Sequence, residues 1–499
     1  MAARAGQERT PLRVSLLCGL AAGALLVALV VPFLGRYGWD RDELYYLAAS
    51  RHLALGYVDY PPLVAVLGWA VREVFGDSLD ALRVSCLLCG VGSVVLVALS
   101  ARELGGGLRT QLGAALAWAL TPYVLGSASI FHPTWLDLLA WSAFGYLALR
   151  ILARPEPRLW PWLGVVAGLG LEAKYTIAAL VLAFAMGLLL TRARTLLRTR
   201  GPWIAAAIAL AILAPNLGWQ IAHGWPSVHF LGSQNQTTAE ETPRFEFALE
   251  QLLFLGAAAV LSVIGVVRLW RDERLRPLAL VPVIVTLIFF LSRGRGYYPL
   301  PADSVAVAAG AVAVAGWLRG ANRRRWALAA LALLQAAVLV VVAPVVVPVL
   351  PTATMISRKV YEPSFYDAEI GWPEFTAATA RAWDSLPAAE RRREAIVTSN
   401  YGEAGALALM GPALGLPTPL SGHLSWQYWR PASLPQRAVV LVGFAPGFVA
   451  RHCDGHRLLG RARNRWHIEN EERGARIVQC RLPATLGSLW GRDFATNQL

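Results

Sequence analysis

The feature that most constrains this chain is its series of long apolar runs, which are separated by short clusters of arginine. An apolar run of about 17–25 residues is long enough to cross a bilayer as an α-helix. Only 16% of the 499 residues are charged, whereas an ordinary soluble domain carries about a quarter. The mean hydropathy of +0.47 agrees with this pattern. The sequence therefore predicts a polytopic α-helical membrane protein.

We identify eleven candidate spans, two of which, 160–173 and 175–191, are short enough to form one broken or re-entrant unit. The other nine are 13–34, 80–101, 111–130, 134–152, 203–220, 249–268, 277–292, 301–318 and 326–350. No small-residue cleavage site follows the first run, so we expect a retained anchor rather than a signal peptide.

The arginine clusters occur in every second loop, on the side that also contains Arg4, Arg9 and Arg13. Basic residues in short loops favour the cytoplasmic side of a membrane. We therefore expect a cytoplasmic N-terminus in the cell membrane, with the segment 35–79 and the tail from residue 351 outside. Because these clusters account for most of the net charge of +14, the charge does not indicate a nucleic-acid partner.

The chain gains charge after residue 350, and its apolar runs become strand-sized, as in EAIVTSN and AVVLVGF. A helical pattern, YGEAGALALMG, follows the first of them. Alternating strands and helices predict a small extracytoplasmic α/β domain over 351–499, after a transmembrane domain over 1–350. Cys453 and Cys480 fall in this tail. They could form a disulfide if the tail is exported, and the sequence alone leaves this open.

An acidic cluster follows the first span, in GWDRDELYYLAASRHLALGYVDYPPL, residues 38–63. It contains Asp40, Asp42 and Glu43, and Asp59 precedes two prolines later in the same stretch. Carboxylates in loops are often simply hydrated. Ionisable groups at membrane depth are functional candidates by default, so we select these four residues as candidates.

Two further ionisable residues lie near the outer ends of predicted spans. Asp137 occurs in FHPTWLDLLAW, where a carboxylate is costly unless it is paired or faces water. Lys174, in GLEAKY, is the only lysine of the predicted membrane region, and its ammonium is a suitable point charge for a phosphate. The alternatives for Lys174 are snorkelling to the interface and neutralisation by Glu172. His132 is either a site residue or a hydrogen-bonded loop residue.

The outer segment SRGRGYYPLPA contains Arg293 and Arg295 close to Tyr298. Outer loops are otherwise poor in arginine, so this pair indicates an anionic ligand. Anchoring at the membrane interface is the alternative.

Sequence motifs for nucleotide or zinc-protease chemistry are absent: we find no P-loop, no dinucleotide fingerprint and no HExxH. His223 and His229, six residues apart, are a weak metal signal. We therefore assign no cofactor and no metal site, although a divalent metal could assist a phosphate group.

Taken together, these motifs resemble the bacterial family 39 membrane glycosyltransferases, which share the GT-C fold with protein O-mannosyltransferases and lipid A aminoarabinose transferases. The resemblance begins with DRDELYYLAASRHLALGYVDYPPL and continues through FHPTWLDLLAWS, GLGLEAKYT, PNLGWQIAHGWP and GYYPLPA. It covers about residues 13–320. It implies a GT-C fold with about eleven transmembrane helices.

The resemblance also implies roles for the acidic cluster. In such enzymes an aspartate of the first outer loop is the catalytic carboxylate, and Asp42 matches it best, with Glu43 beside it. Arg41 separates Asp40 from Asp42, an arrangement that the lipid A enzymes lack, so the choice between these two aspartates stays open. Asp59 matches the position of an acidic-x-Pro-Pro motif.

For the later motifs, the resemblance implies a site for a lipid phosphate. Asp137 is similar to a second aspartate at the membrane boundary. Lys174 matches a lysine that contacts the phosphate, and Arg293, Arg295 and Tyr298 resemble the later part of the same site.

The implied function is transfer of a sugar from a polyprenyl-phosphate donor to an extracytoplasmic acceptor, with inversion at the anomeric carbon. Nucleotide sugars are absent outside the cytoplasm, so a lipid-linked donor fits the expected location. A transporter or flippase for polyprenyl-linked sugars and a non-catalytic envelope assembly protein are the rival classes. The sequence does not identify the sugar, the acceptor, the carrier length or the oligomeric state.

Overall fold

The computed structural model describes residues 10–154, 156–241, 243–317, 321–364 and 366–497. Arg4 and Arg9, which carry part of the orientation argument, lie outside these ranges. The chain divides into two compact units. The first contains the chain up to Leu34, Asp80–Trp219 and Asn235–Val349, and the second contains Gly35–Leu79, Gln220–Gln234 and Leu350–Leu499. The tail therefore shares a unit with the first outer segment, and the domain boundary at residue 350 stays a prediction.

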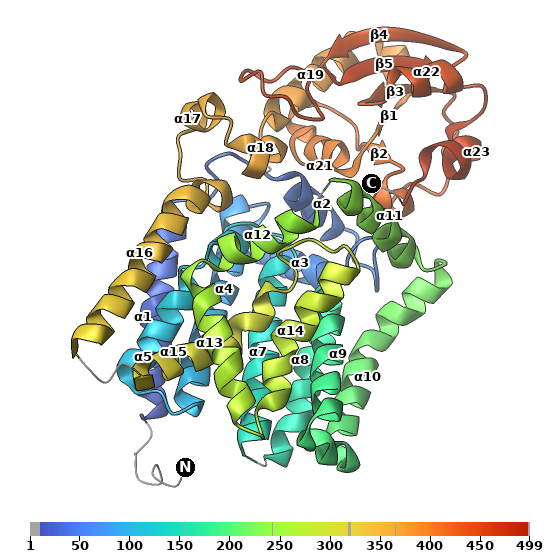
Figure 1. The fold of residues 1–499 in the computed structure, drawn as a ribbon. Helices are drawn as coiled ribbons and strands as arrows, with labels where there is room; N and C mark the ends of the chain where they lie inside the picture. The colour runs from blue at the N-terminus through green and yellow to red at the C-terminus, as the bar shows by residue number, and fades with distance from the viewer. Residues whose placement is uncertain (1–9, 155, 242, 318–320, 365, 498–499) are drawn as a thin grey trace. The chain divides into compact units, whose positions relative to one another are not determined.

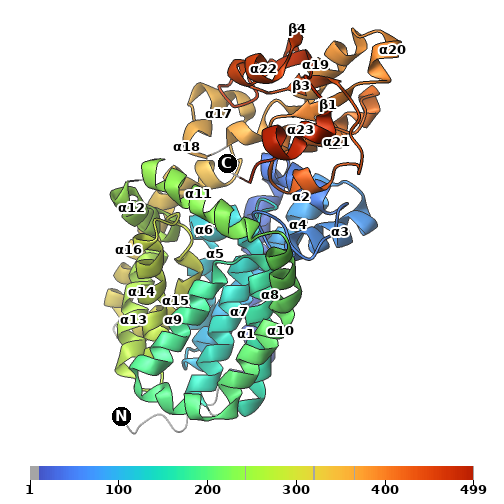
Figure 2. The same ribbon diagram turned by 90° about the vertical axis from the view of Figure 1, so that its right-hand side faces the viewer.

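The first unit is helical (Figures 1 and 2). Its helices are α1 (Leu12–Val30), α4 (Leu79–Glu103), α5 (Leu108–Ala119), α6 (Pro122–Ser127), α7 (Thr134–Ala153), α8 (Trp160–Ala173), α9 (Ile177–Leu190), α10 (Arg200–Ala222), α12 (Arg244–Leu255), α13 (Ala257–Arg271), α14 (Arg276–Leu291), α15 (Ser304–Trp317) and α16 (Ala321–Val346). Helices α7, α8 and α9 pack side by side (Figure 2).

Within the described ranges, six helices are long and apolar enough to cross a membrane, or up to eight if each of two bent helix pairs is one span. The six include α1, α4, α7, α10, α15 and α16. Helices α8 and α9, on the two runs predicted to be short, have 14 residues each, and α14 has 16. These helices support the predicted membrane class, but the count of eleven spans is not confirmed.

Two of the predicted spans are broken for local reasons. Within 111–130 the chain restarts at Pro122, whose missing N–H is tolerated at the first helical position, and the Thr121 hydroxyl caps the new helix. Within 249–268 the chain bends by 97° between α12 and α13. The residue at this bend is Gly256, which has φ 56°, a conformation that glycine adopts without steric cost.

The second unit combines short helices with a small sheet. Its helices are α2 (Arg41–Ala49), α3 (Leu63–Phe75), most of α11 (Pro226–Glu241), α17 (Thr352–Ser357), α18 (Tyr361–Ser364), α19 (Trp372–Asp384), α20 (Ala388–Arg391), α21 (Tyr401–Met410), α22 (Pro446–His452) and α23 (Leu486–Leu489). Its strands are β1 (Ala395–Thr398), β2 (Leu420–Ser421), β3 (Ala438–Val442), β4 (Gly455–Arg461) and β5 (Arg476–Arg481). The strands and the helix predicted from the tail sequence correspond to β1, β3 and α21.

The strands form one mixed sheet in the order β2-β1-β3-β5-β4. Strands β1, β2 and β3 are parallel, and β5 runs antiparallel to β3 and β4. Alternate residues of a strand point to opposite faces. Ile396 and Val440 accordingly belong to a core that includes residues of α19 and α21, whereas Val397 and Leu441 belong to a core with residues of α22 and α23. Helices therefore cover both faces of the sheet.

The disulfide that the sequence left open joins Cys453, at the end of α22, to Cys480 in β5, with their Cα atoms 5.5 Å apart. Disulfides persist in oxidising compartments. This bond therefore agrees with the expected extracytoplasmic location of the tail.

Helix α2 packs against α21 within the second unit. Leu44 of α2 belongs to the same core as α19 and α21. The approach is close because α21 carries glycine at the contact. A Cβ built on Gly405 would lie 2.8 Å from Leu44 Cβ, and one built on Gly402 would lie 2.3 Å from Arg41 Cγ. The small size of these glycines thus allows α2 to be held against the tail.

Replacing Gly405 by alanine is expected to lower the free energy of unfolding by about 1–3 kcal/mol through overpacking, although alanine has the higher helix propensity. Gly447 of α22 provides the control, since a Cβ built there would meet no atom within 4 Å outside its chain neighbours and its own helix backbone. Gly447→Ala should be neutral or slightly stabilising. Thermal unfolding of both variants in detergent compares them, and equal melting temperatures would contradict the packing argument.

Candidate active site

Asp40 and Glu43 form the N-terminal cap of α2. The Asp40 carboxylate accepts a hydrogen bond from the Asp42 N–H at 2.8 Å, and the Glu43 carboxylate accepts one from the Asp40 N–H at 3.0 Å. This reciprocal arrangement is a capping box, which satisfies two backbone donors at the start of a helix. Burial, with the charges of Asp42 and Glu43, raises the pKa of Asp40 well above its ordinary value. Two of the three clustered carboxylates thus have a structural role.

Asp42, in contrast, points its Oδ1 atom at a side chain of the tail. The Tyr401 hydroxyl donates a hydrogen bond to this atom at 2.7 Å. Tyr401 is the first residue of α21 and follows the end of β1, and the Asn400 side chain caps the helix there. Donor and acceptor are 359 residues apart in the sequence, so this contact could not be predicted from the sequence.

Asp59 forms a second tyrosine–aspartate pair. The Tyr45 hydroxyl donates to Asp59 Oδ1 at 2.8 Å and itself accepts from the Ser425 N–H at 3.0 Å. The rings of Tyr45 and Tyr401 lie 4.9 Å apart. Burial raises the pKa of Asp59 to about 8, with a further increase from the charge of Asp42, while the hydrogen bond from Tyr45 opposes this shift. The structure therefore brings Asp42 and Asp59 into one cluster of aspartates and tyrosines.

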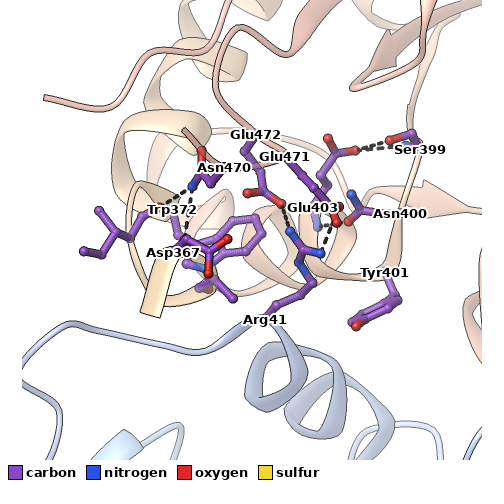
Figure 3. A network of polar contacts seen from close by, with 12 residues as sticks. Arg41, Asp367, Trp372, Ser399, Asn400, Tyr401, Glu403, Asn470, Glu471 and Glu472 are labelled. Atoms are coloured by element: carbon purple, nitrogen blue, oxygen red, sulfur yellow. Dashed lines mark hydrogen bonds and ion pairs between the residues drawn. The ribbon is translucent and has the colours of Figure 1, made fainter. Parts of the chain in front are cut away.

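Arg41 anchors the start of α2 to the tail. Its guanidinium forms ion pairs with Glu471 at 2.9 Å and with Glu472 at 2.6 Å (Figure 3). Glu403 of α21 lies in the same region, where it accepts hydrogen bonds from the backbone and hydroxyl of Ser399 (Figure 3). Burial raises the pKa of Glu403 to about 8. Arg41 is thus part of a dense ionic network between two distant chain segments.

The first unit contains a separate cluster around Asp137, which is buried at the start of α7. The Asp137 carboxylate accepts hydrogen bonds from Trp141 Nε1 at 2.5 Å and from the Thr176 hydroxyl at 2.8 Å. Lys174 is near enough to interact with it electrostatically. The buried Asp137 carboxylate is therefore stabilised by two hydrogen bonds and by the nearby charge of Lys174.

Lys174 follows the end of α8, and its ammonium lies over the rings of two tyrosines. The Nζ atom is 4.5 Å from the ring centre of Tyr298 and 5.3 Å from that of Tyr297. In the described part of the chain, no acceptor hydrogen-bonds to this ammonium. The carboxylate of Glu172 accepts from Asn216 instead. The neighbouring glutamate therefore does not neutralise Lys174 by direct pairing.

The other candidate residues of the first unit, Arg295, Arg293 and His132, have different surroundings. Arg295 interacts electrostatically with Lys174, so the structure brings it to the same cluster. Arg293 is exposed. His132 shares a hydrogen bond of 2.8 Å between its Nδ1 atom and the Thr134 hydroxyl, and its site role stays a prediction. Among the described residues, no group of three His, Cys, Asp or Glu could hold a metal ion.

Tyr401, Tyr45 and Ser425 were not among the residues predicted for the site. One signal was available for Tyr401. It lies between a predicted strand and a predicted helix, and ligands of open α/β sheets bind beyond the carboxyl ends of the strands. The capping box was also readable as Asp-x-x-Glu at residues 40–43.

The raised pKa of Asp59 predicts a pH-dependent stability. Its ordinary value is 3.8 and its folded value is about 8, so between these pH values the folded chain holds a proton that the unfolded chain has lost. Stability should therefore fall as pH rises, by up to about 1.4 kcal/mol per pH unit from this group, and level off above pH 8. Asp59→Asn removes the titration and keeps an acceptor for Tyr45. Melting temperatures of the two proteins between pH 5 and 9 should diverge as pH rises, whereas parallel curves would place Asp59 in its ordinary range.

Comparisons with known proteins agree with the resemblance read from the sequence. The family model described as dolichyl-phosphate-mannose-protein mannosyltransferase matches residues 59–219, which include Asp59, Asp137 and Lys174. The solved structure of ArnT from Cupriavidus metallidurans in the apo state superimposes with a TM-score of 0.54 at 16% identity, covering 93% of this chain and 97% of ArnT. The form bound to undecaprenyl phosphate gives 0.52 at 15% identity, covering 94% and 98%. The chain thus has the GT-C fold, and the predicted resemblance to family 39 membrane glycosyltransferases is confirmed.

Curated relatives are also similar in sequence, and two of them illustrate the match. One is undecaprenyl phosphate-alpha-4-amino-4-deoxy-L-arabinose arabinosyl transferase 1 of Sodalis glossinidius (strain morsitans), 29% identical over 310 residues, which are 56% of this chain and 55% of the relative. The other is the lipid A galacturonosyltransferase RgtD of Rhizobium johnstonii, 29% identical over 185 residues, which are 36% and 38% of the two chains. The chain spans about half the length, or less, of the curated relatives it matches.

Proposed function

We propose that this chain is an integral membrane glycosyltransferase that moves a sugar from a polyprenyl-phosphate donor to an extracytoplasmic acceptor. The relative from Sodalis is named for an undecaprenyl-phosphate-linked sugar, and ArnT is solved with undecaprenyl phosphate bound. Both names support a lipid-linked donor here. The acceptor class is a glycan, lipid or protein of the cell envelope.

The observation that carries this proposal is the environment of the Lys174 ammonium. Its ammonium, which has three N–H donors, lies against two tyrosine rings without a hydrogen-bond acceptor among the described residues. Such a group in an apolar helical unit is suited to a phosphate, whose charge it can neutralise. Arg295 adds positive charge to this cluster. The family model covers Lys174, which supports the same assignment.

In the proposed reaction, an acceptor hydroxyl attacks the anomeric carbon of the donor sugar, and Asp42 accepts the hydroxyl proton. The bond between the anomeric carbon and the phosphate oxygen breaks, and polyprenyl phosphate leaves. Lys174, with Arg293 and Arg295, stabilises the charge of the leaving phosphate. A single displacement inverts the anomeric centre. We choose Asp42 over Asp40 and Glu43 because those two carboxylates cap α2.

The cell membrane is the proposed location, with the N-terminus in the cytoplasm and the tail outside. The disulfide between Cys453 and Cys480 supports an oxidising compartment for the tail.

A transfer assay tests the proposal. The purified chain in lipid nanodiscs is mixed with undecaprenyl phosphate that carries a radiolabelled pentose or hexose, and with an envelope extract as acceptor. We expect label in the acceptor fraction and release of free undecaprenyl phosphate in equal amount. A flippase would move the labelled lipid across vesicles without releasing the phosphate. Intact donor in every combination would overturn the proposal.

A further inference from the structure

The proposed mechanism uses Asp42 as a base but does not explain how its carboxylate is oriented. Helix α2 fixes the backbone of Asp42, and the rotamer of its side chain depends on the contacts of the carboxylate. The hydroxyl of Tyr401 contacts Oδ1 at 2.7 Å. This contact fixes one of the two carboxylate oxygens, and the donor comes from the tail.

Tyr401 is itself held from three sides. Its backbone N–H donates to His423 Nδ1 at 3.3 Å, and its ring lies 5.2 Å from the ring of His423. The Tyr401 ring also contacts the ring of Tyr45, which belongs to α2. Helix α21 is fixed at the same end by the Asn400 cap, and its glycines allow the close approach of α2. The hydroxyl is therefore placed by packing that leaves the ring little freedom.

We propose that Tyr401 is a positioning residue for the glycosyl transfer reaction, which holds the carboxylate of Asp42 ionised and oriented, so that the tail completes the active site. This inference rests on the proposed function. It assigns to residues 351–499 a part in catalysis that the family resemblance, which ends near residue 320, does not cover.

The physical reason is the hydrogen bond that the Tyr401 hydroxyl donates to the Asp42 carboxylate. Asp40 at the N-cap of α2, Tyr46 of α2, and Asp59 and Tyr60 on the following loop interact electrostatically with Asp42. A hydrogen bond donated to the charged form of a carboxylate favours that form. Tyr401 supplies this bond, whereas Tyr45 supplies the corresponding bond to Asp59. Loss of the Tyr401 hydroxyl should therefore make Asp42 protonate at higher pH.

The test is the pH dependence of kcat for Tyr401→Phe, which keeps the ring and its packing. A hydrogen bond to a charged group is worth enough to move the acid limb of the pH–rate profile up by about one to two pH units. Turnover should fall about tenfold or more on the acid side of the shifted limb and recover as pH rises.

Tyr37→Phe is the matched control. It removes a tyrosine hydroxyl of the same unit that donates to the Leu350 carbonyl over the same distance of 2.7 Å. This variant should leave the acid limb where it is in the unchanged protein. Equal effects in the two variants, or a uniform loss at every pH for Tyr401→Phe, would indicate a structural role and overturn the inference.

Asp42→Asn separates the two proposals. If it abolishes transfer while Tyr401→Phe leaves the profile unmoved, the positioning role fails and the proposed function stands. If Asp42→Asn transfers sugar at the normal rate, the base assignment fails, and the role of Tyr401 fails with it.

Discussion

Replacing Asp42 by asparagine is expected to lower the turnover number by about 10²–10⁴-fold, the usual contribution of a positioned general base. The amide has the shape of the carboxylate but cannot take up the proton of the acceptor hydroxyl. Its oxygen can still accept the hydrogen bond from Tyr401, so the contact between α2 and α21 should survive. The melting temperature is therefore expected to change little. Turnover is measured as release of undecaprenyl phosphate, with both substrates saturating.

Asp40→Asn and Glu43→Gln provide controls that remove one charge each from the same cluster. Asparagine caps helices about as well as aspartate, and glutamine can take the place of glutamate in a capping box. Both variants should keep α2 intact and lose less than tenfold in turnover. If Asp40→Asn is as inactive as Asp42→Asn, Asp40 is the base and the assignment from the capping geometry is wrong.

The length of the apolar runs and the low charge predicted the helical membrane class, because a chain that crosses lipid must satisfy its backbone hydrogen bonds internally, as a helix does. The limits of that argument appear at Gly256 and Pro122. There, single residues break runs that are otherwise apolar, so that neither of the runs 111–130 and 249–268 forms one continuous helix. Length and apolar content alone could not locate those breaks.

The candidate site was predictable in its acidic residues but not in their individual roles. The pattern Asp-x-x-Glu at residues 40–43 carried the capping signal, which separates Asp40 and Glu43 from Asp42. The partner of Asp42 could not be inferred, because Tyr401 reaches it through tertiary packing of α21 on α2. A single sequence shows which side chains have suitable chemistry. Contacts between residues that are hundreds of positions apart are visible only in the folded structure.

The second large effect is expected for Lys174→Met, which replaces the ammonium with an uncharged side chain of similar length. A hydrogen bond to a charged group contributes about 1.5–3 kcal/mol, which corresponds to a loss of about 10–150-fold in kcat/KM for the donor. Part of the loss should appear in KM, because the donor phosphate is already charged. Part should appear in kcat, because the leaving phosphate gains charge as the bond breaks.

Lys359→Met is the matched control, since Lys359 is the other lysine of the sequence. It is exposed and forms an ion pair with Glu362 at 3.0 Å, an interaction of small energetic value on a surface. This variant should leave kcat/KM within about twofold of the unchanged protein. Binding of free undecaprenyl phosphate to the two variants gives a readout that does not depend on turnover. Equal affinity of Lys174→Met and Lys359→Met would show that Lys174 does not hold the phosphate, and the cluster with Tyr298 would then be a packing feature of the helical unit.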